Sequence, residues 1–132
     1  MRTLLAQQGT DLVDLVAPTT DPDRLQRNAA EASGFLYLVS TTGVTGSGTD
    51  TTNTLPAYVE RVRGATDLPL YVGFGISTPQ QAASVAQIAD GVIVGSALIK
   101  LVTKAGDDAV AAAATFLGQM VQAVHSPKGS SR

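Results

Sequence analysis

The chain has 132 residues, a formal net charge of −2, one histidine and no cysteine, and it is 44% hydrophobic against 15% charged. This composition suits one globular domain with a modest core, and it excludes disulfides, thiolate metal sites and metal sites built from several imidazoles. Lys and Arg are scattered and form no basic face, so nucleic acid is not an expected partner. No apolar run reaches the roughly 20 residues that span a bilayer, and no signal-peptide pattern is present, so we expect a cytoplasmic protein with no membrane partner.

The first third of the chain predicts two helices and two strands. We expect a helix that ends near Gln8, a strand over Leu12–Val16, a helix that starts at Pro22 after an Asp21 N-cap and stops at Gly34, and a strand over Leu36–Val39. Asp14 interrupts the apolar run of the first strand. Its carboxylate either marks an end or edge position in contact with solvent or points into a functional site.

The rest of the chain continues the alternation of strands and helices. We expect a helix with Leu55, Tyr58, Val59 and Val62 on its apolar face, then a strand over Leu70–Val72 and a helix that opens with a Thr78–Gln81 capping box and stops at Gly91. A strand over Val92–Val94 and helices over "LIKLV" and from Asp107 to Val124 should follow. Residues 125–132 form a polar tail that we expect to be disordered. Apolar strands separated by helices predict an α/β fold with a parallel sheet, in chain order and with right-handed crossovers.

Small residues follow three of the predicted strands. The segments are "STTGVTGSG", "GFGIS" and "GSA", and they carry almost no charge. In parallel α/β folds the carboxyl ends of the strands form the ligand site. Glycine lets a ligand approach the backbone, and the following helix N-termini present free N–H groups. This combination predicts an anion site, and phosphate is the anion that such sites commonly bind.

Each of these segments has other interpretations when it is taken alone. "GFGIST" partly resembles the dinucleotide-binding glycine fingerprint, but the third glycine is missing. "GVTGSGTD" is not a phosphate-binding loop of the Gly-Lys-Ser/Thr type, since no lysine follows. The glycines could also serve only to make tight turns, an interpretation that weakens when all three loops lie at one edge of one sheet.

Four segments together resemble the tryptophan synthase alpha subunit family. They are "LVAPTT", "YLVSTTGVTG", "GFGIS" and "GVIVGSALIK", and they come in the order and at the spacing of that family. The resemblance covers nearly the whole chain but only the second half of the family's fold. It implies that residues 1–124 form the C-terminal half of a TIM-type (β/α)8 barrel. The family cleaves indole-3-glycerol phosphate to indole and glyceraldehyde 3-phosphate in tryptophan biosynthesis.

The resemblance also implies roles for particular residues and partners. The phosphate-binding positions match Gly46, Gly75, Gly95 and Ser96, and the substrate pocket matches Tyr37, Thr45, Phe74 and Ile93. The loop that contains Thr45 would be a mobile lid over the substrate. A phosphorylated small molecule and the beta subunit would be the partners. No cofactor is expected in this chain, because pyridoxal phosphate belongs to the beta subunit.

One departure from the family limits what we expect of this chain. The family's acid–base glutamate and aspartate lie in the N-terminal half of its barrel, and no carboxylate here replaces them, so we assign no catalytic residue and expect the isolated chain to be inactive. A complete barrel typically needs about 250 residues, which suggests a truncated reading frame or a fragment. Two alternatives remain: a non-catalytic half-barrel that binds a phosphorylated ligand, and another phosphate-binding barrel enzyme. The segment "YLVSTTGVTG" favours the family over the latter.

Overall fold

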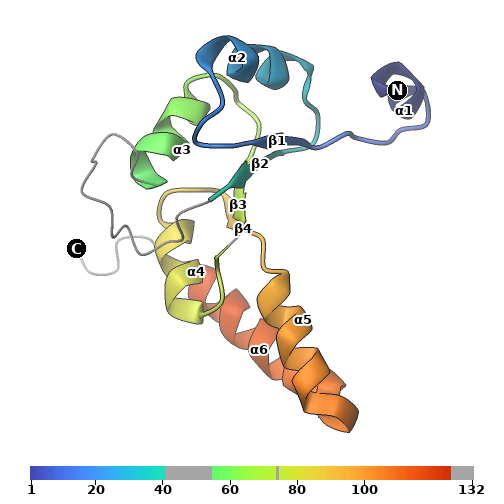
Figure 1. The fold of residues 1–132 in the computed structure, drawn as a ribbon, viewed down its shortest axis with the longest axis vertical. Coiled ribbons are helices and arrows are strands. Elements are labelled where there is room, and N and C mark those ends of the chain that lie inside the picture. Colours follow the sequence, from blue (N-terminus) through green and yellow to red (C-terminus); the bar gives the residue numbers. More distant parts are fainter. Residues whose placement is uncertain (41–54, 74, 126–132) are drawn as a thin grey trace.

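Four parallel strands alternate with helices in the computed structural model of the chain, which describes residues 1–40, 55–73 and 75–125. Figure 1 shows the elements in chain order. They are α1 (Arg2–Gln7), β1 (Asp14–Val16), α2 (Pro22–Glu31), β2 (Leu36–Val39), α3 (Leu55–Arg63), β3 (Leu70–Gly73), α4 (Pro79–Ala86), β4 (Gly91–Val92), α5 (Ser96–Ala105), the 3₁₀ turn η2 (Gly106–Asp108) and α6 (Ala109–Val124).

The strands form one sheet in the order β1-β2-β3-β4, and every neighbouring pair is parallel. The predicted parallel order is therefore confirmed. Three strands differ in extent from the prediction: β1 starts at Asp14 rather than Leu12, β3 ends at Gly73 rather than Val72, and β4 covers Gly91–Val92 rather than Val92–Val94. The ladder reaches one residue past β4, since the Ile93 N–H donates to the Val72 carbonyl at 2.8 Å. It stops there because the partner strand β3 ends at Gly73.

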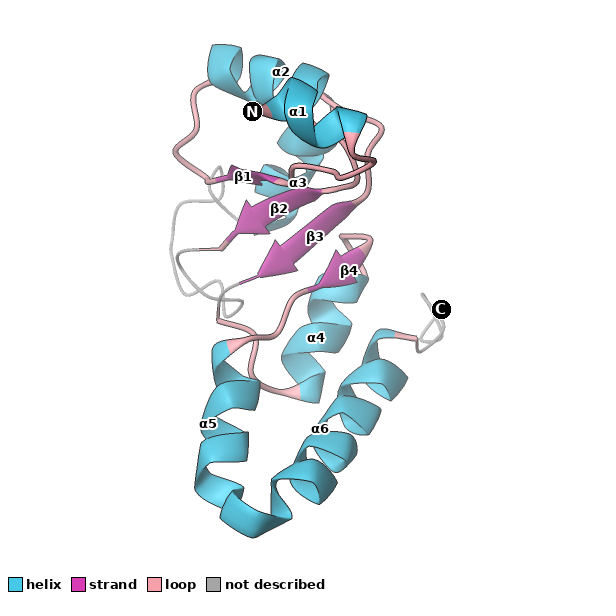
Figure 2. Cartoon of the chain, turned by 90° about the vertical axis from the view of Figure 1, so that its right-hand side faces the viewer, coloured by secondary structure: helices cyan, strands magenta, loops and turns pink. Residues whose placement is uncertain are grey.

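The hydrophobic core lies on one face of the sheet. Alternate strand residues such as Leu36, Leu38, Leu70 and Val72 are fully buried, as the period of two along a strand requires. They pack against α2, α3, α4 and α6 through Leu25, Tyr58, Val59, Val62, Ala82, Val85 and Met120. Figure 2 looks onto the other face, where no described helix lies in front of the strands. The sheet is thus covered by helices on one side.

Local capping explains where two helices begin. The Asp21 carboxylate accepts from the Arg24 N–H at 2.8 Å, as predicted for the start of α2. Thr78 and Gln81 form the predicted reciprocal capping box at α4. Three other predicted helix boundaries are wrong. The C-cap of α2 is Ala32 rather than Gly34, and α4 ends at Ala86 rather than at Gly91. Helix α6 starts at Ala109 rather than at Asp107, because the 3₁₀ turn η2 precedes it.

Two acidic side chains are held at the amino end of the sheet. Asp14 opens β1 and accepts from Arg2 of α1 at 2.5 Å. Asp90 accepts from the Leu70 N–H at 2.9 Å and pairs with Arg63 at 3.3 Å. Asp14 is the first residue of an edge strand, as one interpretation expected, but its side chain is only 15% exposed and its Oδ2 atom is buried without a hydrogen-bond partner, so the expected contact with solvent is wrong. Asp14 lies at the opposite end of the sheet from the carboxyl ends of the strands.

The described helices are short. None of them is both long and apolar enough to cross a membrane.

Candidate functional site

A small cavity of about 110 Å³ lies at the carboxyl ends of β3 and β4. It is lined by Tyr37, Gly75, Ile76, Ile93, Gly95 and Ser96. Five of the eight residues predicted for the site therefore surround one space. The other three, Gly46, Thr45 and Phe74, lie outside the residues that the structure describes.

Tyr37 enters this site from the uncovered face of the sheet. It is the second residue of β2, and it alternates with the buried Leu36 and Leu38. A Cβ atom on Gly73, at the end of β3, would lie 2.6 Å from Cζ of the Tyr37 ring. The absence of a side chain at Gly73 is therefore what allows the tyrosine to lie across the neighbouring strand and reach the cavity.

Gly75 and Ile76 turn the chain from β3 toward α4. Gly75 has φ +78°, a left-handed conformation that is unfavourable for residues with a Cβ atom. Ile76 is 4% exposed and anchors the turn in the core. We did not predict Ile76 as a lining residue, although its place inside "GFGIS" beside Gly75 was a signal that could have identified it.

The two helices that start beside the cavity differ in whether their first N–H groups are already bonded. At α4, the Gln81 Oε1 atom accepts from the backbone N–H groups of Ser77 and Thr78, and Thr78 Oγ1 accepts from Gln81 N–H. At α5, the N-cap is Gly95, which has no side chain to accept from the first turn. Ser96, the first residue of α5, is exposed. The N-terminus of α5 is thus the one that can offer backbone donors to a ligand.

The electrostatic environment of the cavity suits an anion. None of the described residues that line it is charged at neutral pH, and neither α4 nor α5 has an acidic residue in its first turn. Among these described residues, a negative ligand would meet the positive end of the α5 dipole and no carboxylate. Within the described part of the chain, no group of three or more His, Cys, Asp or Glu residues could hold a metal ion.

Tyr58 of α3 fixes the carboxyl ends of β1 and β2 next to this site. Its hydroxyl donates to the Val16 carbonyl at 2.6 Å and is also hydrogen-bonded by the Val39 backbone. Burial raises the pKa of Tyr58 well above the ordinary tyrosine value, so the hydroxyl remains a donor at all physiological pH values. The sequence marked Tyr58 only as part of a helix face. A buried tyrosine normally needs a hydrogen-bond partner, and that need was the signal available.

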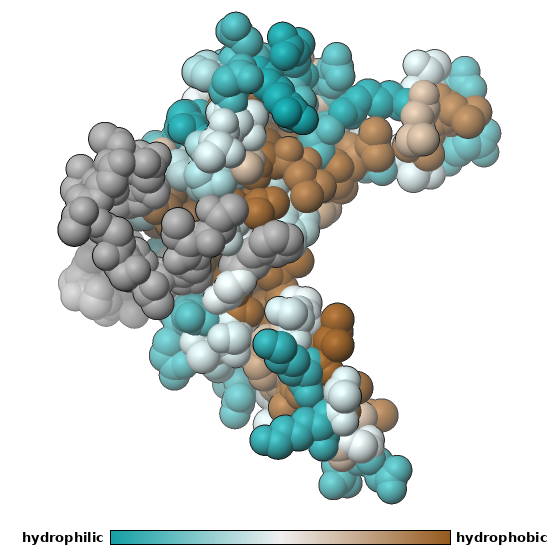
Figure 3. Space-filling model, viewed as in Figure 1, coloured by the Kyte–Doolittle hydropathy of each residue, from teal (hydrophilic) through white to brown (hydrophobic). Residues whose placement is uncertain are grey.

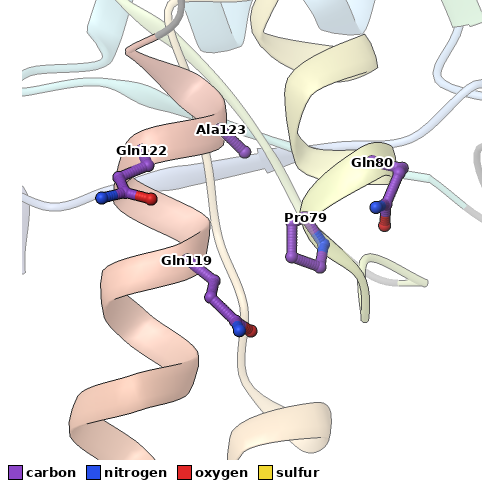
Figure 4. Close-up of a pocket in the computed structure, with 5 residues that line it drawn as sticks. All are labelled: Pro79, Gln80, Gln119, Gln122 and Ala123. Carbon is purple, nitrogen blue, oxygen red and sulfur yellow. The ribbon is translucent and has the colours of Figure 1, made fainter.

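A second hollow lies between α4 and α6 and is larger, about 520 Å³. Figure 4 shows its lining residues, Pro79, Gln80, Gln119, Gln122 and Ala123. The side chains of Gln80 and Gln122 point away from the gap between the helices in this view. The hollow therefore lacks a set of converging donors, and we do not regard it as the anion site.

Comparison with known proteins decides the family. A family profile described as "Tryptophan synthase alpha chain" matches residues 1–125. The chain belongs to the tryptophan synthase alpha chain family. A tryptophan synthase alpha chain from Chloroflexus aurantiacus is 48% identical over 128 residues, which are 96% of this chain and 48% of that protein. One from Geobacter sp. is 56% identical over 96 residues, 73% of this chain and 36% of that protein.

Solved structures of the same family have the same fold. The alpha chain from Legionella pneumophila superposes with a TM-score of 0.79 at 36% identity, covering 93% of this chain and 45% of the other. Mycobacterium tuberculosis tryptophan synthase gives a TM-score of 0.80 at 36% identity, covering 96% and 46%. The chain therefore spans about half the length of the alpha chains it matches. Its four strands are the C-terminal half of a TIM-type (β/α)8 barrel, as the sequence predicted.

Proposed function

We propose that this chain supplies the phosphate-binding half of a tryptophan synthase alpha active site. The reaction is the cleavage of indole-3-glycerol phosphate into indole and glyceraldehyde 3-phosphate. The observation that carries the proposal is the single cavity lined by five predicted site residues in a chain of this family. Gly75, Gly95 and Ser96 would surround the phosphate, and Tyr37 and Ile93 would contact the rest of the substrate.

The residues that line the cavity indicate which part of the reaction this half of the barrel would serve. Cleavage needs a proton delivered to the indole ring and a proton removed from the glycerol hydroxyl, which is work for positioned carboxylates. The described lining of the cavity has none, and Tyr37 is its one titratable side chain. This half would therefore hold and orient the substrate, and the acid–base groups would come from the other half of a complete barrel. A general acid or base in position typically contributes 10²–10⁴-fold in rate.

The partners and cofactors follow from the same assignment. The indole product would pass to a beta subunit, which carries the pyridoxal phosphate, and this chain would bind no cofactor of its own. A second candidate function is binding of a phosphorylated ligand without turnover. The uncharged cavity lining favours it for the isolated chain.

A chimera tests the catalytic proposal. The matching part of the Chloroflexus aurantiacus alpha chain is replaced by this chain, and indole formation from indole-3-glycerol phosphate is measured. We expect turnover by the chimera and none by the 132-residue chain alone. Gly95→Val in the chimera should raise KM at least tenfold while leaving the fold intact. A folded chimera that binds glycerol phosphate but forms no indole would favour the binding function instead.

A further inference from the structure

We propose that Tyr71, with Phe35 stacked against it, forms an aromatic floor beneath the cavity and contacts the indole ring of the substrate. The proposal rests on the function proposed above and assigns a role to a residue for which the sequence predicted only a place in a strand. Tyr71 is the second residue of β3, between the fully buried Leu70 and Val72, so its side chain points to the face of the sheet that no described helix covers. Figure 3 shows hydrophobic surface in the recess between α1 and α5, where this face lies.

A glycine on the next strand fixes the position of the Tyr71 ring. Tyr71 pairs with Gly91 of β4, and a Cβ atom on Gly91 would lie 2.9 Å from Cδ1 of the ring. The ring therefore lies over Gly91 and occupies the space that a side chain there would need. Tyr37 lies across Gly73 of its own neighbouring strand in the same way.

This arrangement places the Tyr71 ring directly below two side chains that line the cavity. Ile93 lines the cavity and follows Gly91 by two residues, so both lie on the same face of the sheet. Gly73, over which the Tyr37 ring lies, likewise follows Tyr71 by two residues. The Tyr71 ring is thus one layer nearer to the amino ends of the strands than the Tyr37 ring and Ile93.

The Phe35 ring extends this layer toward β2. Its centroid lies 4.6 Å from that of Tyr71, and the two ring planes are tilted by 32°. Phe35 directly precedes β2, and both aromatic residues are half-buried in the described structure. Since aromatic pairs at such separations attract each other beyond the effect of burial, the two rings hold each other in place and present one uncharged aromatic surface.

The size of the cavity explains why the substrate would reach this layer. Its volume of about 110 Å³ is that of about four water molecules in the liquid, which suits a phosphate group but not an indole ring as well. The phosphate would lie at Gly95, where α5 presents its first N–H groups. The rest of the substrate would then extend past Tyr37 along the same face, where the next side chains are Tyr71 and Phe35. Their rings offer the flat apolar surface on which an indole ring stacks favourably.

Binding of two ligands to the chimera described above tests the floor. Glycerol phosphate carries only the phosphate end, whereas indole-3-propanol phosphate also carries the indole ring and lacks the glycerol hydroxyl groups that cleavage needs. Tyr71→Leu keeps an apolar side chain for folding but removes the ring. We expect it to weaken binding of indole-3-propanol phosphate about tenfold and to leave binding of glycerol phosphate within about twofold. Tyr71→Phe should recover most of the loss. Gln87→Leu introduces leucine at an exposed residue after α4 and should change neither affinity.

Gly91→Ala tests the position of the ring even where Tyr71→Leu fails to fold. The new Cβ atom would displace the Tyr71 ring from β4, so binding of indole-3-propanol phosphate should weaken while binding of glycerol phosphate is retained. In a Tyr71→Leu background the same change should have little further effect, because the ring that it displaces is gone. An unchanged affinity of Gly91→Ala for the indole ligand would overturn the proposal.

The two ligands also distinguish failure of the floor from failure of the proposed function. A parent chimera that binds neither ligand would overturn the proposed function and the floor with it. A parent chimera that binds both ligands, with a Tyr71→Leu variant that binds both as well as the parent, would overturn the floor alone. Equal loss of both ligands in Tyr71→Leu and in Gly91→Ala would show that Tyr71 only supports the fold, and the proposal would be wrong.

Discussion

The ring of Tyr37 occupies the position that a side chain on Gly73 would need. The two residues lie on neighbouring strands, and a Cβ on Gly73 would be 2.6 Å from Cζ of the ring. Gly73 itself is buried. The glycine at the end of β3 thus has a packing role as well as its place beside the predicted phosphate loop.

Gly73→Ala should therefore destabilise the fold by about 1–3 kcal/mol, the usual cost of overpacking. Gly118→Ala is the matched control. A Cβ at Gly118 meets no atom within 4 Å, and alanine is the better helix former, so this change should stabilise α6 by about 0.5–1 kcal/mol. Denaturant unfolding at one fixed protein concentration measures both.

A double-mutant cycle shows whether the loss of stability in Gly73→Ala comes from a clash with Tyr37. Tyr37→Ala removes the ring that a Cβ at Gly73 would strike, so the two changes together should cost less than the sum of the single changes. Strict additivity would contradict a direct clash between these residues.

The anion site predicts a contrast between two adjacent positions. A Cβ at Gly95 meets no protein atom within 4 Å, so Gly95→Val should cost no more than about 1 kcal/mol of stability through the weaker N-cap. Its side chain would enter the cavity and should abolish phosphate binding. Ser96→Ala should only weaken binding, because the backbone N–H groups of α5 remain. Titration with glycerol phosphate, followed by backbone amide shifts, measures both. Shifts that centre on Gln80 and Gln119 would instead place the ligand in the hollow between α4 and α6.

The Tyr58 hydroxyl predicts a stability effect without a change in shape. Tyr58→Phe leaves the buried Val16 carbonyl without this donor, which should cost about 1–3 kcal/mol. Glu60→Gln on the exposed face of the same helix should change stability by less than about 0.5 kcal/mol. Urea unfolding of the two variants tests the difference. Equal midpoints would mean that the hydroxyl contributes nothing to holding α3 on the sheet.

Two variants of Asp90 can distinguish the contribution of its ion pair to stability from that of its hydrogen bond to the backbone. Asp90→Asn loses the charge that faces Arg63 but keeps an oxygen for the Leu70 N–H, so it should cost at most about 1 kcal/mol, since the pair is exposed. Asp90→Ala loses both and should cost about 1 kcal/mol more. Thermal unfolding in low and high salt distinguishes the two terms. A strong salt dependence of the alanine variant alone would contradict this division.

Much of this fold could be predicted from the sequence because its signals are local. The apolar runs around Leu36 and Leu70 gave strands whose boundaries agree closely with the structure, and the capping residues Asp21 and Thr78 gave two helix starts. Periodicity and capping depend on residues a few positions apart, so a single sequence contains them. The extent of β4, which was predicted wrongly, depends on where the neighbouring strand β3 stops.

Part of the candidate site could also be predicted from the sequence, and part of it could not. The small residues after the strands were sufficient to predict Gly75, Gly95 and Ser96 as neighbours, because the carboxyl ends of parallel strands share one edge. The sequence predicted the capping box in which Gln81 accepts from the N–H groups of Ser77 and Thr78, but the expectation that both following helices present free N–H groups overlooked its consequence, that the open donors belong to α5, whose N-cap is Gly95. It also could not place Tyr37 over Gly73, or Tyr58 against Val16.

The sequence by itself determined the order of the elements, the parallel sheet and the family, because these follow from short-range patterns and motif spacing. Only the tertiary structure decided how Tyr37 lies across Gly73 and which face of the sheet the described helices leave uncovered. Both depend on contacts between segments far apart in the chain, where the absence of one side chain, as at Gly73, decides what can pack there.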